Sequence, residues 1–336
     1  MSSSSSDKVS KEASNNKNKP FLRVTCLACL LVACTVTSIV TALVLTNSAY
    51  NRTPATDWVL VGGLQDTQAS VRLRPSTVDG IFVVATASDL LNDGGSEKDV
   101  LGDLNDDAGV VFRQDLELVD QVQALTVDGL TANTAYHYGV VANGEVSLRG
   151  TFRTTVPAGQ RFNFTVATAG CAWTGSTHAV FDEIRKEDPL LFLHLGDFHY
   201  QDIGNNDLEE RLDAIGTTLG SSTQAELYRS TGLVSMWDDH DYLGIGGSSG
   251  YAEPELGARE TALDSYRRAF PHYELAAPND APYHAFTVGT VRFIVTDLRS
   301  EASGENMYSD TQRAWFLAEL AQAAEYDFVV WISTSK

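Results

Sequence analysis

Residues 190–200 read Leu-Leu-Phe-Leu-His-Leu-Gly-Asp-Phe-His-Tyr, an apolar run that stops at a Gly-Asp pair. A run that is apolar almost throughout is typical of a β-strand buried on both faces of a parallel sheet. Gly196 ends the run, and Asp197 and Tyr200 follow it directly. The stretch therefore predicts a buried strand with metal-binding side chains at its carboxyl end.

Two further strand-like runs end in the same way. Residues 162–168 are rich in β-branched and aromatic residues and lead to Cys171. Residues 232–237 are also strand-like and lead to Asp239 and His240. Each run therefore places a side chain of metal-binding type at its carboxyl end.

A helix is predicted between the first two runs. Residues 179–186 have apolar side chains at helical spacing, and Pro189 stands where the helix must end. Strand, helix and strand form a βαβ unit with a right-handed crossover, which predicts an α/β fold. Because sites in open α/β sheets form beyond the carboxyl ends of the strands, we expect the three groups of polar side chains to meet there.

The five polar residues suit a two-metal centre. A carboxylate such as Asp197 can bridge two cations that lie about 3.5 to 4 Å apart. The phenolate of Tyr200 and the thiolate of Cys171 are anionic donors suited to a trivalent, iron-like ion, whose charge would keep them deprotonated. Asp239 would serve a second ion, calcium or another divalent metal. In an in-line displacement at phosphorus, His240 would contact the phosphate or protonate the leaving group.

Several of these residues also have a structural interpretation. Cys171 is the only cysteine that follows residues 24–46, so it is either a metal ligand or a free thiol. A Gly-Asp pair after a strand is often only a turn. We expect His194 and His199 to be structural histidines. Arg299 either faces phosphate or forms a structural ion pair.

The motifs resemble those of the PhoD-like alkaline phosphatases, a branch of the calcineurin-like metallophosphoesterases. The resemblance covers roughly residues 58–336. It implies a metallophosphatase domain over residues 160–336 that hydrolyses phosphate mono- or diesters, with Cys171, Asp197 and Tyr200 as metal ligands. The motifs that carry it are Gly170-Cys171 and residues 196–200, 237–241, 264–267, 296–300 and 309–315.

The chain departs from the family at two places. The family has an asparagine shortly after Asp-Asp-His, whereas residues 242–247 read Tyr-Leu-Gly-Ile-Gly-Gly. The family's last ligands lie in a second Gly-Asp-x-His motif, well downstream of a strand like residues 326–333, and this sequence has none. We therefore expect a core that is incomplete at its C-terminus, with a sheet edge and an apolar face uncovered. The activity of the 336-residue chain itself stays open, and the alternative function is that of a non-catalytic surface protein.

Residues 56–156 predict an all-β domain ahead of the phosphatase domain. Residues 58–64, 69–74 and 81–86 have the composition of strands separated by turns. Residues 127–138 resemble the corner of a fibronectin type III or related immunoglobulin-like β-sandwich, where a tyrosine holds the turn before a late strand. In the alternative function, this sandwich would bind the partner.

The N-terminal segments predict a membrane location. Residues 1–23 are rich in Ser, Asn and Lys and are expected to form a disordered cytoplasmic tail. Residues 24–46 contain no charged residue and are long enough to cross a bilayer. Because this run exceeds the apolar core of a cleaved signal peptide, we favour a signal anchor with the rest of the chain extracellular or lumenal. If the signal is cleaved, the protein is secreted.

The charge of the chain argues against one class of partner. The whole chain carries a formal net charge of −20 and its first 23 residues carry +3, so the remainder carries −23. Nucleic-acid-binding proteins normally present a basic footprint, so we expect no nucleic-acid partner. An acidic surface does not prevent phosphate hydrolysis if metals supply local positive charge. The sequence leaves the oligomeric state open.

Overall fold

The computed structural model describes residues 58–75, 80–86, 109–117, 121–142, 145–248, 250, 254–303 and 306–334. The predicted tail, residues 1–23, and the predicted anchor, residues 24–46, lie outside the described residues. Within the described ranges, no helix has the length and apolar character needed to cross a membrane. This finding corrects the membrane location expected from the sequence.

A six-stranded sheet carries the predicted site. It consists of β1 (Trp58–Gly62), β2 (Gln68–Arg74), β5 (Gln123–Asp128), β8 (Val166–Ala169), β9 (Leu191–His194) and β10 (Gly232–Ser235). Their order across the sheet is β5-β2-β1-β10-β9-β8, and β8, β9, β10 and β1 run parallel. Helix α4 (Val180–Lys186) joins β8 to β9, so the predicted βαβ unit is confirmed.

The first strand of this unit is shorter than predicted. The sequence favours a strand over residues 162–168, but β8 begins at Val166. Val166 pairs with Leu191, the first residue of β9, and no strand of the described chain lies beside residues 162–165. The rings of Phe162 and Phe164 instead stack at 4.9 Å and pack against the core.

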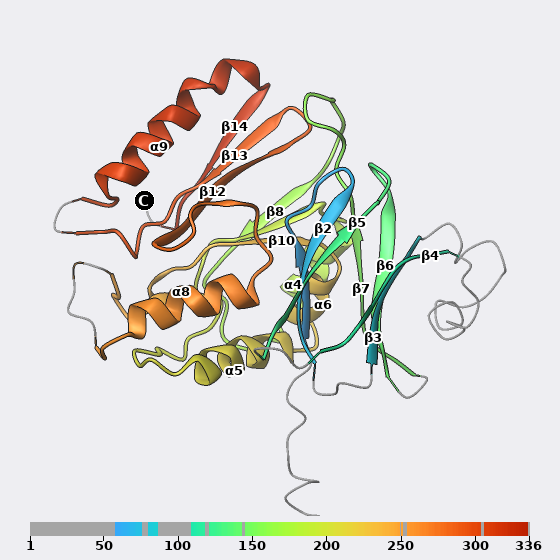
Figure 1. The fold of residues 1–336 in the computed structure, drawn as a ribbon, viewed down its shortest axis with the longest axis horizontal. Helices are drawn as coiled ribbons and strands as arrows, with labels where there is room; N and C mark the ends of the chain where they lie inside the picture. The colour runs from blue at the N-terminus through green and yellow to red at the C-terminus, as the bar shows by residue number, and fades with distance from the viewer. Residues whose placement is uncertain are drawn as a thin grey trace, which may run out of the picture. The chain divides into compact units, whose positions relative to one another are not determined.

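Helices cover one face of the main sheet. They are α5 (Leu208–Leu219), α6 (Gln224–Arg229), α7 (Asp239–Tyr242) and α8 (Ala258–Ala269), and α5 and α8 run beside one another in Figure 1. Helices α5 and α6 lie between β9 and β10, and α8 follows α7 in the chain. Trp58, Phe192 and Leu233 point from the sheet into this helical layer and are almost fully buried.

A second sheet packs on the opposite face of the main sheet. Its strands, in spatial order, are β11 (Leu275–Ala277), β12 (Ala281–Val288), β13 (Val291–Val295) and β14 (Phe328–Ile332). Leu191 and Leu193 of β9 share one core with Phe293 and Val295 of β13, while Phe192 faces the helices. This alternation follows the two-residue repeat of a strand and explains why residues 190–195 are apolar apart from His194.

Helix α9 (Asp310–Ala321) lies along the outer face of the second sheet (Figure 1). A short 3-10 helix, η1 (Ala323–Glu325), follows it and leads into β14. β14 pairs with β13 and stands at the edge of its sheet among the described strands. Its side chains Phe328 and Trp331 are 69% and 51% exposed, which matches the uncovered sheet edge and apolar face expected from the sequence.

The remaining strands form a third sheet. It contains β3 (Gly80–Thr86), β4 (Val110–Asp115), β6 (Ala135–Ala142) and β7 (Glu145–Arg153) in the order β4-β3-β6-β7. The hydroxyl of Tyr136 accepts a hydrogen bond from the backbone N–H of Thr131 at 2.7 Å, which is the tyrosine corner expected in this segment.

The three-stranded part of residues 56–156 is continuous with the main sheet. β1 pairs with β10 through Gly62 and Leu233, and β2 and β5 continue the sheet outward. Hydrogen-bonded strands therefore cross the boundary expected near residue 156. The division into a fibronectin III-like domain and a phosphatase domain stays a prediction.

Candidate metal centre

The predicted ligands lie on tight loops at the carboxyl end of the main sheet. Gly196 has a φ of +92°, and a Cβ added there would lie 2.6 Å from the backbone nitrogen of Asp238. Glycine is therefore required at this position both for its conformation and for the close approach of the two loops. Cys171 and Asp197 have φ values of +58° and +56°, which L-residues rarely adopt. Such strained residues concentrate at functional sites.

Cys171 and Tyr200 converge on one oxygen of Asp197. The thiol of Cys171 donates to Asp197 Oδ2 at 3.4 Å, and the hydroxyl of Tyr200 donates to the same oxygen at 3.1 Å. Asp197 is buried, and its other oxygen, Oδ1, has no hydrogen-bond partner. A buried carboxylate oxygen without a donor is costly, and a bound cation would remove this cost.

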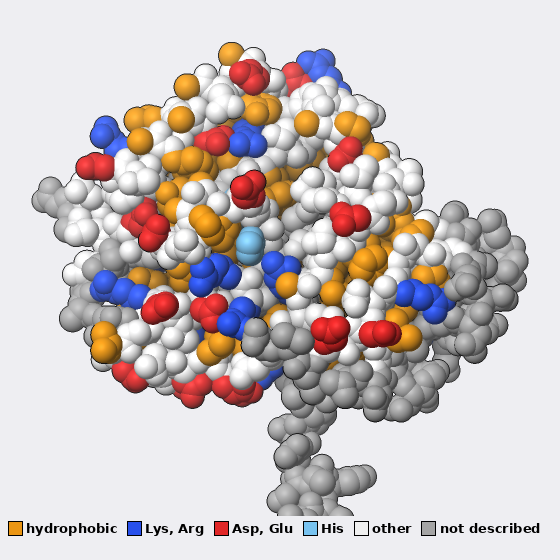
Figure 2. All heavy atoms as spheres, in the orientation of Figure 1, with side chains coloured by type: hydrophobic (Ala, Val, Ile, Leu, Met, Phe, Trp, Pro, Cys, Tyr) orange, Lys and Arg blue, Asp and Glu red, His pale blue; other side chains and the backbone are white. Residues whose placement is uncertain are grey.

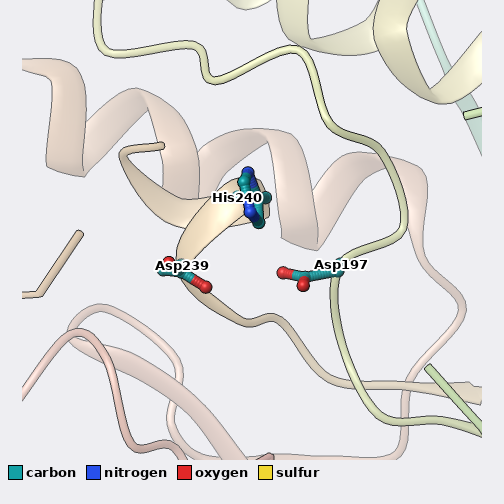
Figure 3. Close-up of side chains that lie close together, drawn as sticks. All are labelled: Asp197, Asp239 and His240. Atoms are coloured by element: carbon teal, nitrogen blue, oxygen red, sulfur yellow. The ribbon is translucent and has the colours of Figure 1, made fainter. Parts of the chain in front are cut away.

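Asp239 and His240 complete the predicted set. Asp197, Asp239 and His240 each offer one ligand atom, and these three atoms lie within 4.8 Å of one another. Figure 3 shows the carboxyl groups of Asp197 and Asp239 pointing toward one another, with His240 beside them. Asp239 begins α7, and its Oδ2 accepts a hydrogen bond of 2.5 Å from the backbone N–H of Gly246. All five residues predicted from the sequence thus lie at one end of the sheet.

His240 is held by a carboxylate that the sequence did not identify. Its Nδ1 lies 2.5 Å from Asp202 Oδ1, which also accepts the backbone N–H of Ile245 at 3.0 Å. The imidazole packs at 4.3 Å, centroid to centroid, against the ring of Tyr200. These contacts fix the ring and leave Nε2 as the nitrogen that Asp202 does not engage.

Asp241 binds the two ligand loops together. Its carboxylate accepts the backbone N–H groups of Asp197 at 2.6 Å, Phe198 at 2.7 Å, Asp238 at 3.0 Å and His199 at 3.4 Å. It also forms a capping box with Asp238 at the start of α7. Desolvation raises the pKa of Asp241 to about 7, although its backbone donors act in the opposite direction.

Arg299 provides a basic group beside the carboxylates. Its guanidinium forms a short ion pair with Asp238 and lies 3.4 Å from Asp239 Oδ1. The interpretation of Arg299 as part of an ion pair is therefore confirmed, and the pair lies directly beside Asp239. Burial raises the pKa of Asp238, although Arg299 lowers it in part.

The loop that carries Arg299 is anchored by Asp297. The buried carboxylate of Asp297 accepts the indole N–H of Trp237 at 2.7 Å and the backbone N–H of Arg299 at 2.8 Å. Gln312 of α9, also buried, accepts the backbone N–H of Asp297 at 2.8 Å and donates to its carbonyl oxygen at 3.0 Å. Residues that follow strands of the main sheet and of the second sheet therefore hold the site together.

The predicted ligands Cys171 and Tyr200 both have pKa values raised above their ordinary ones. Burial raises the pKa of the Cys171 thiol, and Asp197 raises it further. Burial also raises the pKa of the Tyr200 hydroxyl, with Cys171 and Asp197 acting in the same direction. Each group would become an anionic ligand only where a cation offsets these effects.

The other histidines near the site are structural, as expected. His194 and His199 are 1% and 3% exposed, and burial lowers their pKa values to about 3 and about 4. His194 packs among Phe192, Phe198 and Tyr228, and neither of its ring nitrogens has a hydrogen-bond partner.

Arg211 of α5 supports the site from behind and was missed by the sequence analysis. It is 1% exposed, and its guanidinium donates to carbonyl oxygens of α7, of α8 and of the loop after β9: Ile203 at 2.8 Å, Tyr242 at 3.0 Å, Asp241 at 3.2 Å, Asn205 at 3.3 Å and Ala258 at 3.5 Å. Burial lowers its pKa to about 10. The partners of this arginine are backbone carbonyl groups, which every residue has. No sequence pattern therefore predicts its role.

The donor set fits metal ions. It combines a carboxylate with an unpartnered buried oxygen, a thiol, a phenol, a second carboxylate and an imidazole. Thiolate and phenolate suit a highly charged ion, and carboxylates suit a hard divalent ion.

Comparisons with known proteins identify the fold. No family model and no curated protein matches the sequence. Among solved structures, PhoD superposes with a TM-score of 0.65 at 17% identity, over 83% of this chain and 61% of that chain. Purple acid phosphatase PPD1 from yellow lupin (Lupinus luteus) seeds superposes with a TM-score of 0.48 at 13% identity, over 82% of this chain and 50% of that one. The chain has a PhoD-like α/β fold and spans about 61% of the length of the PhoD chain.

Proposed function

We propose that this protein is a metal-dependent phosphoesterase that hydrolyses phosphate mono- or diesters at a two-metal centre. The observation that carries the proposal is the convergence of Cys171 and Tyr200 on Asp197, with Asp239 and His240 close by. The PhoD-like fold supports it, because the convergence occurs at the carboxyl end of the parallel strands.

Each residue has a role that follows from its contacts. Asp197 would bridge the two ions, Cys171 and Tyr200 would hold the more highly charged one, and Asp239 would hold the other. We propose Fe³⁺ with Ca²⁺ or another divalent ion. When bound, the metals would polarise the phosphoryl oxygens and lower the pKa of a water molecule.

Two residues would act on the substrate directly. Arg299 lies beside Asp238 and Asp239, where its guanidinium can donate to a phosphate oxygen. His240 would give a proton to the leaving oxygen from Nε2, since Asp202 engages its Nδ1. Asp202 would hold the ring in place for this transfer.

The metal assignment is tested by absorption spectroscopy. A ferric ion held by Cys171 and Tyr200 should give a visible charge-transfer band in the iron-loaded protein. Tyr200→Phe should shift or abolish the band, whereas Tyr326→Phe, a change far along the chain near β14, should leave it in place. A colourless, iron-free protein with full activity would contradict the iron assignment.

The active site is tested by substitution of the bridging residue. Asp197→Ala should abolish metal uptake and lower phosphatase activity by more than about a hundredfold, because even outer-shell changes often cost about 10- to 100-fold. The matched control is Asp280→Ala, in the exposed turn before β12. Retained activity in Asp197→Ala would place the centre elsewhere. A wild-type protein that takes up metal neither there nor at Asp239, and cleaves no ester, would match the non-catalytic alternative instead.

The charge of the protein limits the class of phosphate ester that it can bind well. The net charge of −20 disfavours long polyanions such as nucleic acids. On the face shown in Figure 2, basic side chains are interspersed with acidic ones. We propose small phosphate esters rather than nucleic-acid chains.

A further inference from the structure

An exposed tryptophan stands beside the candidate metal centre. Trp173 is 76% exposed. Tryptophan side chains are highly buried on average, so a tryptophan exposed to this extent is unusual. Its indole stacks on the ring of Tyr200, with centroids 5.9 Å apart and planes 18° from parallel. Tyr200 contacts one side of the indole, and most of the remaining surface is open to solvent.

The loop that carries Trp173 is fixed in place. The backbone N–H of Ser176 donates to the carbonyl oxygen of Trp173 at 2.9 Å and to the side-chain oxygen of Gln224, a fully buried residue, at 3.0 Å. The hydroxyl of Thr174 accepts the backbone N–H of Tyr200 at 2.8 Å. The loop is therefore tied both to α6 and to the ligand loop, so the indole needs little ordering before it binds a ligand.

A second exposed apolar side chain belongs to the loop that contacts Asp202. Ile245 is 79% exposed, and its backbone N–H donates to Asp202, the partner of His240. A series of contacts thus links Trp173 to Tyr200, Tyr200 to His240, and His240 to the loop of Ile245. A site that gathers carboxylates, an arginine and a histidine is thus linked by contacts to the exposed ring of Trp173 and to the loop of the exposed Ile245.

We propose that Trp173 is a stacking platform for the leaving group, and that the preferred substrates are phosphate esters whose leaving group carries a flat aromatic ring. This inference rests on the proposed function, because it places the phosphate at the candidate metal centre. A ring on the ester's alcohol then lies within reach of the indole, which is one aromatic residue away from His240. Ile245 supplies apolar contact from the other loop.

Stacking decides the magnitude of the preference. A flat ring stacked on an aromatic side chain strengthens binding by about 5- to 150-fold, whereas a short alkyl group buries little area. A phenyl ring and a nucleobase are both flat aromatic rings. The structure therefore assigns a flat ring on the leaving group, and the experiment distinguishes a phenyl ring from a nucleobase.

The test compares esters with leaving groups of similar basicity. Benzyl phosphate and ethyl phosphate are both alkoxide esters, and adenosine 5′-monophosphate serves as the nucleobase arm. The ratio of kcat/KM for benzyl to ethyl phosphate should fall roughly tenfold in Trp173→Ala. Trp173→Phe should keep most of the ratio, because a flat ring remains. Phe328→Ala removes another exposed aromatic ring, on β14, and should keep the wild-type ratio.

Binding is measured separately with non-hydrolysable benzylphosphonate and ethylphosphonate by calorimetry, on the metal-loaded protein. The wild type should favour benzylphosphonate, and Trp173→Ala should lose that preference. No preference in the wild type, or an equal preference in Trp173→Ala, would overturn the platform. Loss of turnover on every ester with the phosphonate preference intact would count against the proposed hydrolysis alone. A preference for the adenosine ester over benzyl phosphate would identify a nucleobase as the ring.

Discussion

His194 is a buried histidine whose replacement should stabilise the protein in acid. It lies in β9, is 1% exposed, and neither ring nitrogen has a hydrogen-bond partner. Its neighbours are the rings of Phe192, Phe198 and Tyr228. Burial lowers its pKa from 6.5 to about 3. The perturbation is His194→Leu, which fills the same space with an apolar side chain.

The sign of the pH effect follows from proton uptake. Below pH 6.5 the unfolded chain protonates this histidine, whereas the folded protein does so only near pH 3. The free energy of unfolding therefore falls as the pH drops through this window. At pH 5 the loss from this residue is about 2 kcal/mol relative to pH 8. His194→Leu should remove this loss, and at pH 8 it should add about 1 to 3 kcal/mol by eliminating an unpartnered N–H group.

The assay is urea unfolding at pH 5 and pH 8, and His284→Leu provides the matched comparison. His284 is also buried with a pKa lowered to about 4, but its Nδ1 lies 2.9 Å from the carbonyl oxygen of Pro282. Its replacement should flatten the pH dependence in the same way but lose stability at pH 8, since it removes a hydrogen bond. If His194→Leu unfolds more readily than the wild type at both pH values, the reasoning is refuted, because the ring would then have a partner.

Three further substitutions test how the site is built. Asp241→Ala should lower the free energy of unfolding by about 2 to 5 kcal/mol, because it leaves backbone N–H groups of both ligand loops unpaired; an unchanged urea midpoint would contradict its anchoring role. Gly196→Ala should lower the melting temperature well beyond Gly159→Ala, which has a φ of +84° but nothing within 4 Å of its Cβ; equal shifts would mean that conformation alone decides. Arg211→Met should cost about 3 kcal/mol in urea unfolding because five carbonyl contacts are lost, and near-wild-type stability would show that water replaces them.

The meeting of the site residues at one edge of the sheet was predictable because it depends on local patterns. The apolar run over residues 190–195 and the helical spacing over residues 179–186 define a βαβ unit, and the parallel topology then brings the ends of β8, β9 and β10 to one edge. Residues that directly follow these strands, such as Asp197 and Asp239, could therefore be assigned together. The structure confirms their proximity.

The supporting residues were not predictable because their partners are distant in the chain. Asp241 belongs to a recognised motif, but its bonds to the 197–199 loop join residues more than 40 positions apart. Arg211 occupies a helix whose sequence, Leu-Glu-Glu-Arg-Leu-Asp, is typical of a solvated surface. It is buried only because loops from three segments close over it. The pairing of β1 with β10 is likewise a contact between residues that no sequence pattern connects.

The charges at the site explain why its ligands and its metals depend on one another. Asp197, Asp238 and Asp239 lie together, and Arg299 offsets their charge only in part. Without a cation, desolvation keeps the Cys171 thiol and the Tyr200 hydroxyl protonated, and both donate to Asp197. These two hydrogen bonds satisfy Asp197 Oδ2 in the metal-free protein and must be given up when a metal takes that oxygen. In the proposed metal centre, metal uptake would therefore be coupled to the loss of protons from both groups and should weaken as the pH falls. In the proposed centre, the same geometry would let Cys171 and Tyr200 become anionic ligands only where a cation binds beside Asp197.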